Sequence, residues 1–519
     1  MKRYTLIWIL LAVLLAALIY VLLCGWAEMP LSSLMVCLIA TGLAAVILAN
    51  EMRRPQMKEY NRKKALYPPI PDRYLSKEPP EGGVIFGTDY RTGKFVSEEN
   101  GHVLICGSTG SGKTATCLIP SILSHSKGSS HIVDIKSREL VYKTSQIYDE
   151  NTQIIDFNLK KPWIWGWNLF YKLPKDGTAT EQDVLKVVRE VASVVVPKST
   201  SSDAFWADSA RNEFIGIMLY EFCYGGLTEF IDIVHSMLNI PLREHLEVAI
   251  NSVPRTSLVA SYLTGLAAAA DETLFSVDLT LSQNLYQFVS EEAIWFFRDN
   301  PKRANPLMLN QNGIRQYICV SEEQLDAGFD RMVNLVMKQT LMELQSRTTS
   351  GSYPQTTLYL DEWQRLTESV EELRQVTSSF LKTGRSKHAS AILCCQNLDN
   401  FKKEQIYDIL SNIGYFYVLS SNNANSLTSE VVCKMAGNYY EKEISTSEGK
   451  GTSTSTSFRE KQVLRPDDLN NLGEDGVLII TNHGYVRTHK QGSAYYCTEP
   501  FKSQYEKIIA VNQEVMEGV

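Results

Sequence analysis

A glycine-rich stretch of eight residues lies at 107–114, where the sequence reads GSTGSGKT. It fits the phosphate-loop pattern G-x-x-x-x-G-K-[ST] at every fixed position. Glycines let the backbone curl so that its N–H groups point at a phosphate chain. Lys113 would reach the β- and γ-phosphates, and Thr114 would ligate Mg²⁺. The expected ATP-binding residues of this loop are Gly107, Ser108, Thr109, Gly110, Ser111, Gly112, Lys113 and Thr114.

The segments on either side of this loop predict a strand and a helix. HVLIC (102–106) has the apolar character of a short buried strand, and TATCLIPSIL (114–123) that of a helix. The N-terminus of such a helix adds partial positive charge where phosphates would lie. A glycine turn without a ligand is the alternative, but the full match between a strand and a helix favours a nucleotide site. Pro120 should kink this helix or end it early.

A second strand predicts the carboxylates that complete such a site. In TTLYLDEWQRL (356–366), a β-rich apolar run ends at Asp361 and Glu362. Asp361 would hold Mg²⁺ through its water shell, and Glu362 would polarise the attacking water. An apolar run followed by Asp-Glu is common by chance, so this motif gains its weight from the phosphate loop.

Two more polar residues flank a third expected strand, ASAILCCQNLDN (389–400). Gln396 would end this buried strand and face the γ-phosphate; an ordinary strand-end amide is the alternative. Arg385 precedes the strand in a loop that contains glycine. From there it could stabilise transition-state charge in the site of a neighbouring subunit. A solvated loop charge is the alternative for Arg385.

The first fifty residues predict a membrane anchor. Thr5–Leu23 and Leu31–Ala49 are uncharged runs of nineteen residues, each long enough to cross the hydrocarbon core. Lys and Arg precede the first run and follow the second, which places both ends in the cytoplasm. A signal peptide followed by a core helix is the alternative. The basic stretch 53–64 would contact anionic lipid headgroups.

Charge and cysteine usage exclude some functions. Residues 1–64 contain eight Lys or Arg and three Glu, so the total charge of −7 leaves −12 on residues 65–519. An acidic body argues against wrapping duplex DNA on an exposed basic face, so any DNA contacts would be local. The ten cysteines lack metal-binding or disulfide spacing and are expected as small buried hydrophobes.

The rest of the chain predicts helices and one loop. Apolar residues at helical spacing in 177–275 predict an all-α domain inserted into the sheet. IRQYICV (314–320) should resume the sheet, and 326–347 should form one long helix. The polar stretch 445–457 is expected as a mobile loop, and the end from Phe501 as a helix.

In this order, the features resemble the coupling ATPases of type IV secretion and conjugation systems, the TraG/TraD type, which are related to hexameric DNA translocases. Smaller pieces match as well. They are HIVDIKSREL (131–140), IIDFN to WGWNLF (154–170), AFWADSARNEFIGIMLYEF (204–222) and LRPDDLNNLGEDGVLIITNHG (464–484). The first piece departs from the family's Asp-x-Lys-x-Glu, because Arg138 is one extra residue and Ile135 replaces the usual proline. The loop between the two apolar runs is also shorter than in the better-known members.

The resemblance implies an α/β fold: a RecA-like P-loop ATPase domain with an inserted all-α domain and an N-terminal two-helix transmembrane hairpin. The expected divisions are the hairpin (1–52), a basic juxtamembrane linker (53–80), the first part of the nucleotide-binding domain (81–176), the inserted domain (177–275) and the second part (276–519). Lys113, Glu362 and Arg385 would be catalytic, with Gln396 as a sensor. Thr114 and Asp361 would serve the Mg²⁺.

The implied function is that of a Mg²⁺-dependent ATPase in the bacterial inner membrane, a hexamer with both termini and the ATPase body in the cytoplasm. It would feed single-stranded DNA with bound relaxase to a type IV secretion channel. A coupling ATPase for protein effectors only is one alternative. A nucleotide-gated membrane adaptor without turnover is another, and the intact Glu362 and Arg385 argue against it.

Overall fold

The computed structural model describes residues 70–136, 138–157, 160–174, 178–198, 204–367, 371–399, 401–419, 426–448, 452–470, 472–473, 475–481 and 484–517. The predicted hairpin (1–52) and the linker up to residue 69 lie outside the described residues. The chain divides into two compact units. Cys433–Arg465 belong to one, and Pro69–Val432 with Pro466–Val519 form the other, larger unit.

The larger unit is built on a sheet whose described strands number 14, in the order β1-β3-β2-β16-β15-β12-β4-β11-β10-β5-β9-β6-β7-β8. The strands are β1 (Leu75–Ser76), β2 (Val84–Thr88), β3 (Phe95–Glu98), β4 (Val103–Cys106), β5 (Ser129–Asp134), β6 (Thr152–Asp156), β7 (Ile164–Trp167), β8 (Arg303–Ala304), β9 (Arg315–Cys319), β10 (Thr356–Leu360), β11 (Ala389–Cys395), β12 (Tyr415–Leu419), β15 (Gly476–Thr481) and β16 (Gly484–His489). Neighbours from β12 to β8 are parallel, whereas β1, β3, β2, β16 and β15 form an antiparallel edge. The parallel strands therefore place all their carboxyl ends along one edge of the sheet.

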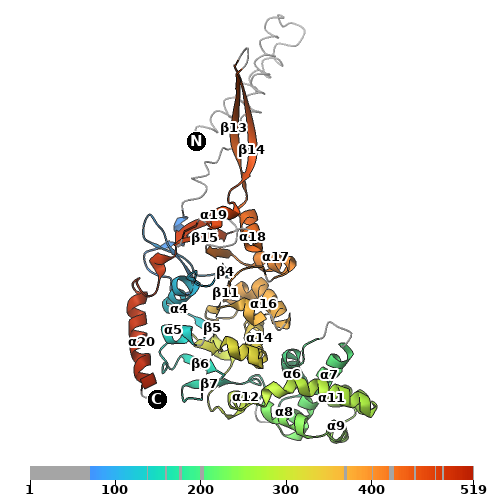
Figure 1. The fold of residues 1–519 in the computed structure, drawn as a ribbon. Coiled ribbons are helices and arrows are strands. Elements are labelled where there is room, and N and C mark those ends of the chain that lie inside the picture. Colours follow the sequence, from blue (N-terminus) through green and yellow to red (C-terminus); the bar gives the residue numbers. More distant parts are fainter. Residues whose placement is uncertain are drawn as a thin grey trace, which may run out of the picture. The chain divides into compact units, whose positions relative to one another are not determined.

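The central strands are covered on both faces. Every residue of β4, β5, β6, β10 and β11 is buried. Burial on both faces explains why β4 is apolar throughout and why β10 and β11 show no alternation of apolar and polar residues. Helices α4 (Ile119–Ser124), α5 (Glu139–Thr144) and α20 (Phe501–Glu517) cover one face, and α14 (Asp330–Ser346) and α16 (Glu371–Thr383) cover the other (Figure 1). The other helices around the sheet are α13 (Glu322–Gln324), α15 (Trp363–Thr367), α17 (Lys403–Asn412), α18 (Leu427–Ala436) and α19 (Pro466–Asn470). The strand expected at 314–320 and the helix expected from Phe501 are confirmed.

Helices α6 to α12 gather at one end of this unit, beyond β7 (Figure 1). They are α6 (Glu181–Val195), α7 (Ala204–Tyr220), α8 (Phe230–Asn239), α9 (Leu242–Asn251), α10 (Leu258–Ala267), α11 (Asp271–Leu285) and α12 (Glu291–Ile294). A capping box of Thr180 and Asp183 starts α6. The predicted boundary at residue 275 falls inside α11, and helical structure continues to Asp299.

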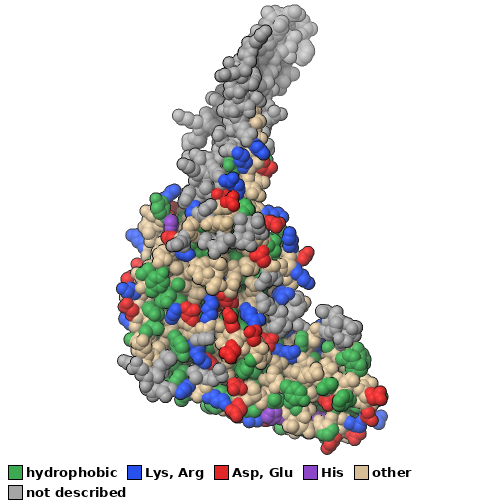
Figure 2. Space-filling model, in the orientation of Figure 1, with side chains coloured by type: hydrophobic (Ala, Val, Ile, Leu, Met, Phe, Trp, Pro, Cys, Tyr) green, Lys and Arg blue, Asp and Glu red, His purple; other side chains and the backbone are tan. Residues whose placement is uncertain are grey.

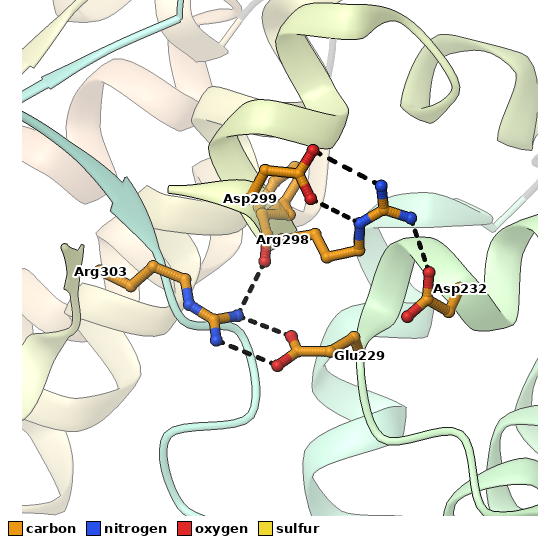
Figure 3. Close-up of polar contacts among 6 residues, drawn as sticks. Glu229, Asp232, Arg298, Asp299 and Arg303 are labelled. Carbon is orange, nitrogen blue, oxygen red and sulfur yellow. Dashed lines mark hydrogen bonds and ion pairs between the residues drawn. The ribbon is translucent and has the colours of Figure 1, made fainter. Parts of the chain in front are cut away.

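A network of ion pairs connects α8 with residues 298–303, which lead from these helices back to the sheet (Figure 3). Arg303, in β8, donates two hydrogen bonds of 2.6 and 3.0 Å to the carboxylate of Glu229, which precedes α8. Arg298 donates 2.7 Å bonds to Asp232 in α8 and to its neighbour Asp299. Paired guanidinium and carboxylate groups of this geometry fix orientation as well as contributing energy.

The expectation of a mobile loop at 445–457 is wrong for its described part. In the smaller unit, β13 (Asn438–Glu448) and β14 (Thr452–Gln462) form an antiparallel hairpin, paired from Asn438↔Gln462 to Glu448↔Thr452. Polar composition suggested disorder, but the threonines of this stretch are β-branched and favour strands. Composition was therefore a poorer guide here than local strand propensity.

The single long helix expected at 326–347 is also wrong in its first turn. Gly328 has φ 101°, which interrupts the turn Leu325–Phe329 and kinks the chain just before α14. Glycine tolerates this left-handed backbone where other residues are strained. Met332 and Met337 of α14 are buried, as expected for core methionines.

Within the described ranges, no single helix is long and apolar enough to span a membrane. The bent pair Ala204–Gly225 and Phe230–Asn239 (112°) has the required length and apolar character only when its two helices are taken together.

Six of the eight described cysteines are buried, so most act as small hydrophobes as predicted. The half-buried Cys223 and the exposed Cys497 do not.

Candidate nucleotide-binding site

The glycine-rich loop runs from the end of β4 into a helix, as the sequence predicts. Gly110 and Gly112 have φ of 77° and 90°, a left-handed backbone that glycine adopts without strain. A side chain on Gly107 would meet the Ser111 hydroxyl at 2.7 Å and the side chain of Leu419 at 2.8 Å. The loop can therefore curl tightly at the carboxyl edge of the sheet only with glycine at these positions.

The helix after the loop begins with π-helical winding at Thr114–Leu118 and continues as α4. Pro120 lies in the first turn of α4, so it marks the change of winding, and the helix still reaches Ser124. The irregularity predicted at Pro120 therefore takes the form of a π-helical turn just before the proline.

Two buried polar groups of the loop suit a phosphate chain. The Lys113 side chain is buried, and its ammonium donates a 2.5 Å hydrogen bond to the Gly107 carbonyl. The buried Ser111 hydroxyl has no hydrogen-bond partner among the described residues. Buried polar groups are normally satisfied, so this hydroxyl fits a site that completes its hydrogen bonds with a ligand. The loop residues thus fit a bound nucleotide.

The two carboxylates expected after the second strand lie at the end of β10. Asp361 is fully buried, and its Oδ2 is 3.1 Å from the ammonium of Lys136, which is also 3.6 Å from Glu362 Oε1. Apart from this ion pair, neither oxygen of Asp361 has a hydrogen-bond partner in the described part of the chain. Carboxylate oxygens left open in this way fit the water shell of Mg²⁺.

Burial raises the pKa of Asp361, while the positive charges of Lys136 and Lys113 lower it. Lys113 acts on Asp361 electrostatically, so the phosphate loop and the carboxylates share one local field. The negative charge of Glu362 adds to the effect of burial, and the two cations offset only part of it, so the pKa of Asp361 lies above its usual value.

Gln396 follows β11, the strand between β4 and β10. The Gly107 N–H donates to the Cys395 carbonyl at 3.3 Å, and the Cys106 thiol contacts the Gln396 carbonyl at 3.7 Å. The structure therefore brings the loop, Gln396 and the Asp361–Glu362 pair to the carboxyl ends of three adjacent parallel strands. Ligands of open α/β sheets bind at this edge.

Arg385 lies away from this cluster. It is exposed in the turn Gly384–Lys387, which precedes β11, and β11 is parallel to β4. Arg385 lies close enough to His102, which precedes β4, to affect its pKa. Burial is the larger cause and the positive charge of Arg385 the smaller one, and together they lower the pKa of His102 to about 4. Arg385 is therefore at the amino edge of the sheet, opposite the phosphate loop of its own chain.

Sequence reasoning missed Lys136 and Asp134, although their position carried a signal. Asp134 ends β5, the other neighbour of β10, so both residues follow a buried strand at the edge where the site lies. The Asp134 carboxylate accepts hydrogen bonds from the backbone N–H groups of Lys136, Leu140 and Val141. Burial raises the pKa of Asp134 to about 6. Asp134 thus fixes the turn from which Lys136 reaches the two carboxylates.

The sheet and the site together define a P-loop nucleotide-binding protein of the α/β class. Among solved structures, the chain is similar to the bacterial conjugative coupling protein TrwBdeltaN70 in its unbound form, with 16% identity over 75% of this chain and 84% of that one and a TM-score of 0.55. The plasmid coupling protein TrwB in complex with the non-hydrolysable ATP analogue ADPNP matches with a TM-score of 0.56, 16% identity and the same coverage. TrwB in complex with ADP and Mg²⁺ matches at 0.55 and 15% identity, again over 75% and 84% of the two chains. At these identities the likeness shows a shared fold.

The sequence profile described as Type IV secretory system Conjugative DNA transfer matches residues 57–518. The chain therefore belongs to this family of type IV secretion coupling proteins, in agreement with the resemblance of its motifs. No curated protein matches the sequence significantly.

Proposed function

We propose that this protein is a membrane-anchored ATPase that couples DNA with bound relaxase to a type IV secretion channel during conjugative transfer. One observation carries the enzymatic part: Lys113, Gln396 and the Asp361–Glu362 pair come from the carboxyl ends of three adjacent strands. Membership of the conjugative transfer family supports the biological part.

The side chains divide the work of hydrolysis. Lys113 and Thr114 would hold the β- and γ-phosphates and Mg²⁺, as expected of a P-loop, and the metal would neutralise charge on the phosphates. Asp361 would bind the water shell of the metal in its ionised form. Glu362 would accept a proton from the attacking water, and Gln396 would contact the γ-phosphate. TrwB, the relative of similar fold, has been crystallised with ADPNP and with ADP and Mg²⁺, which supports ATP and Mg²⁺ as ligands.

The position of Arg385 supports action as a ring, which we propose to be a hexamer. An exposed arginine at the amino edge of the sheet is remote from its own phosphate loop but free to enter the site of an adjacent copy. An arginine supplied by a neighbour typically increases phosphoryl-transfer rates 10³- to 10⁵-fold. Residues 1–52 would anchor each copy in the inner membrane, with both termini and the ATPase body in the cytoplasm.

The test is ATP hydrolysis by the full-length protein in lipid nanodiscs, with no DNA, with single-stranded DNA and with duplex DNA. We expect Mg²⁺-dependent turnover that single-stranded DNA stimulates, and loss of both binding and turnover in Lys113→Ala. A wild-type protein that hydrolyses no ATP under any of these conditions would contradict the proposal. Turnover indifferent to DNA but stimulated by a secreted protein would favour the effector-only alternative.

A further inference from the structure

The segment after β16 lies against the phosphate loop, far from it in sequence. β16 is antiparallel to β15, which is antiparallel to β12, and β12 is parallel to β4. β16 therefore ends at the edge where the phosphate loop begins. The half-buried Lys490, directly after β16, donates a 2.5 Å hydrogen bond from its ammonium to the Ser111 carbonyl. The same nitrogen is 3.6 Å from the position that a Cβ on Gly112 would occupy.

Asp475 holds the backbone around Lys490 in place through hydrogen bonds. Its carbonyl accepts from the Lys490 N–H at 3.1 Å, and its carboxylate accepts from the Gln491 N–H at 2.5 Å. The other carboxylate oxygen is 2.8 Å from Nδ1 of His489. Residues on both sides of Lys490 are thus held by one aspartate, which limits the positions that the ammonium can reach.

The residues after Lys490 complete the helix that follows the loop. In the π turn the Ile119 N–H donates to the Thr114 carbonyl, so the next donor along would be Pro120, which has no N–H. The Tyr495 N–H donates to the Ala115 carbonyl at 3.1 Å instead. The buried Ser493 hydroxyl donates to the Thr116 carbonyl at 2.6 Å. The segment 490–495 is therefore a built part of the phosphate-loop structure.

We propose that Lys490 is a second cationic ligand for the phosphate chain of the nucleotide, in addition to Lys113. The two ammonium groups contact carbonyls at opposite ends of the loop, Gly107 for Lys113 and Ser111 for Lys490. A hydrogen bond between two charged groups is shorter and stronger than one to a neutral carbonyl. A phosphate oxygen would therefore compete with the Ser111 carbonyl for the Lys490 ammonium when a nucleotide binds. Because Gly112 has no side chain, the path between this ammonium and the loop is open.

This inference rests on the proposed nucleotide site, and three variants of the full-length protein test it. We expect Lys490→Gln to weaken ATP and ADP binding about 10- to 100-fold, the usual size of a lost charged hydrogen bond. Glutamine can still donate an N–H to the Ser111 carbonyl, so this variant keeps the tether but not the charge. Lys490→Arg should bind within a few-fold of wild type. Lys502→Ala on α20, which removes an exposed lysine away from the loop, is the matched control and should bind like wild type.

The measurement is the dissociation constant of ATP and of ADP by calorimetry at several salt concentrations. A phosphate ligand requires that Lys490→Gln also reduce the dependence of affinity on salt. Wild-type affinity in Lys490→Gln would overturn the inference and indicate a purely structural tether. Equal weakening in Lys490→Gln and Lys490→Arg would also overturn it, because the loss would then not depend on the positive charge. If the wild-type protein binds no nucleotide at all, the proposed function fails. Lys113→Ala would then show no loss of binding relative to wild type.

Discussion

Glu362, the predicted catalytic carboxylate, has a strained backbone. Its φ of 54° is left-handed, which costs a residue other than glycine about 1–2 kcal/mol. Such strain persists where the surrounding structure over-determines it, commonly at functional sites. The side chain is buried beside Lys136 rather than extended into solvent.

We therefore expect Glu362→Gln to bind ATP as wild type does but to turn it over about 10²- to 10⁴-fold more slowly, because the amide cannot accept a proton from water. ATP affinity and single-turnover rates separate the two effects. The control is Glu323→Gln, at an exposed carboxylate in α13, which should change neither. Turnover within twofold of wild type would remove Glu362 from the catalytic step.

Lys136 predicts a pH effect at the same site. Its charge is among the influences that lower the pKa of Asp361 against the raising effect of burial. In Lys136→Met the pKa of Asp361 should rise further, so the ionised form that serves Mg²⁺ is lost at a higher pH. The acidic limb of the pH profile of ATP turnover should then move to higher pH, with a lower ratio of rates at pH 6 and pH 8. Lys127→Met, at an exposed ion pair with Glu81, is the control, and superimposable profiles of all three proteins would contradict the argument.

At the residue scale, the sequence predicted what is local and missed what is distant. The phosphate loop and the Asp361–Glu362 pair are contiguous motifs at strand ends, and the structure places them as expected. Lys490 is 379 residues from Ser111, so only the order of the strands brings them together. Lys136 comes two residues after the end of β5. It can contact the carboxylates that follow β10 only because β5 lies next to β10.

At the element scale, apolar runs located β4, β10 and β11 because these strands are buried on both faces. The same reasoning missed the hairpin of β13 and β14, whose serine and threonine residues give no apolar signal. It also ended the helical segment too early, because α11 continues across residue 275 without a break in pattern. Element boundaries depend on packing partners that one segment of sequence does not contain.

The ion pairs of Figure 3 carry a prediction about how the helical segment is fastened. Arg303→Ala removes two hydrogen bonds to the Glu229 carboxylate and a third, to the Phe297 carbonyl. We expect the free energy of unfolding to fall by about 1–3 kcal/mol, because the pair is half-buried and its hydrogen bonds join charged groups. Arg243→Ala, at the exposed pair with Asp271, is the matched control and should cost less than about 1 kcal/mol.

Thermal unfolding and amide exchange in α8 measure these two variants. Faster exchange in α8 for Arg303→Ala, and not for Arg243→Ala, would show that the network holds the start of this helix. If both variants shift the unfolding midpoint equally, burial does not distinguish the two pairs and the proposed fastening has no special strength.

At the scale of the whole molecule, buried histidines make stability depend on pH. Burial is the largest influence that lowers the pKa of His102, His125 and His131 to about 4. The unfolded chain binds these protons near pH 6.5, so their contribution is complete above that pH and is lost as the pH falls toward 4. Each histidine accounts for up to about 3 kcal/mol. Carboxyl groups whose pKa burial raises act in the opposite sense and offset part of the loss. They are Asp134, with a pKa of about 6, and Glu190, Glu213, Asp278 and Asp361.

The three histidines should therefore lower the unfolding midpoint of the full-length protein as the pH falls from 6 to 4.5, and removing one of them should reduce this effect. His131→Gln should make this fall shallower by about one proton, because one titrating group is gone. The same dependence of the unfolding midpoint on pH in the wild type and in His131→Gln would contradict the buried, neutral state of His131.

The ring itself is tested through Arg385, because no single chain can complete the site that we propose. β11 has seven residues, so roughly 20 Å of strand separates the turn that carries Arg385 from the edge where Gln396 and the phosphate loop lie. Arg385→Ala should lower ATP turnover at least about 10³-fold while leaving nucleotide affinity unchanged. Mixed with Lys113→Ala, it should regain activity, since an intact loop in one copy then meets an intact arginine in the next. The regained rate should follow the statistical fraction of such interfaces as the mixing ratio varies. Mixtures that remain as inactive as either parent, although both variants co-assemble, would place the action of Arg385 within its own chain or outside the reaction.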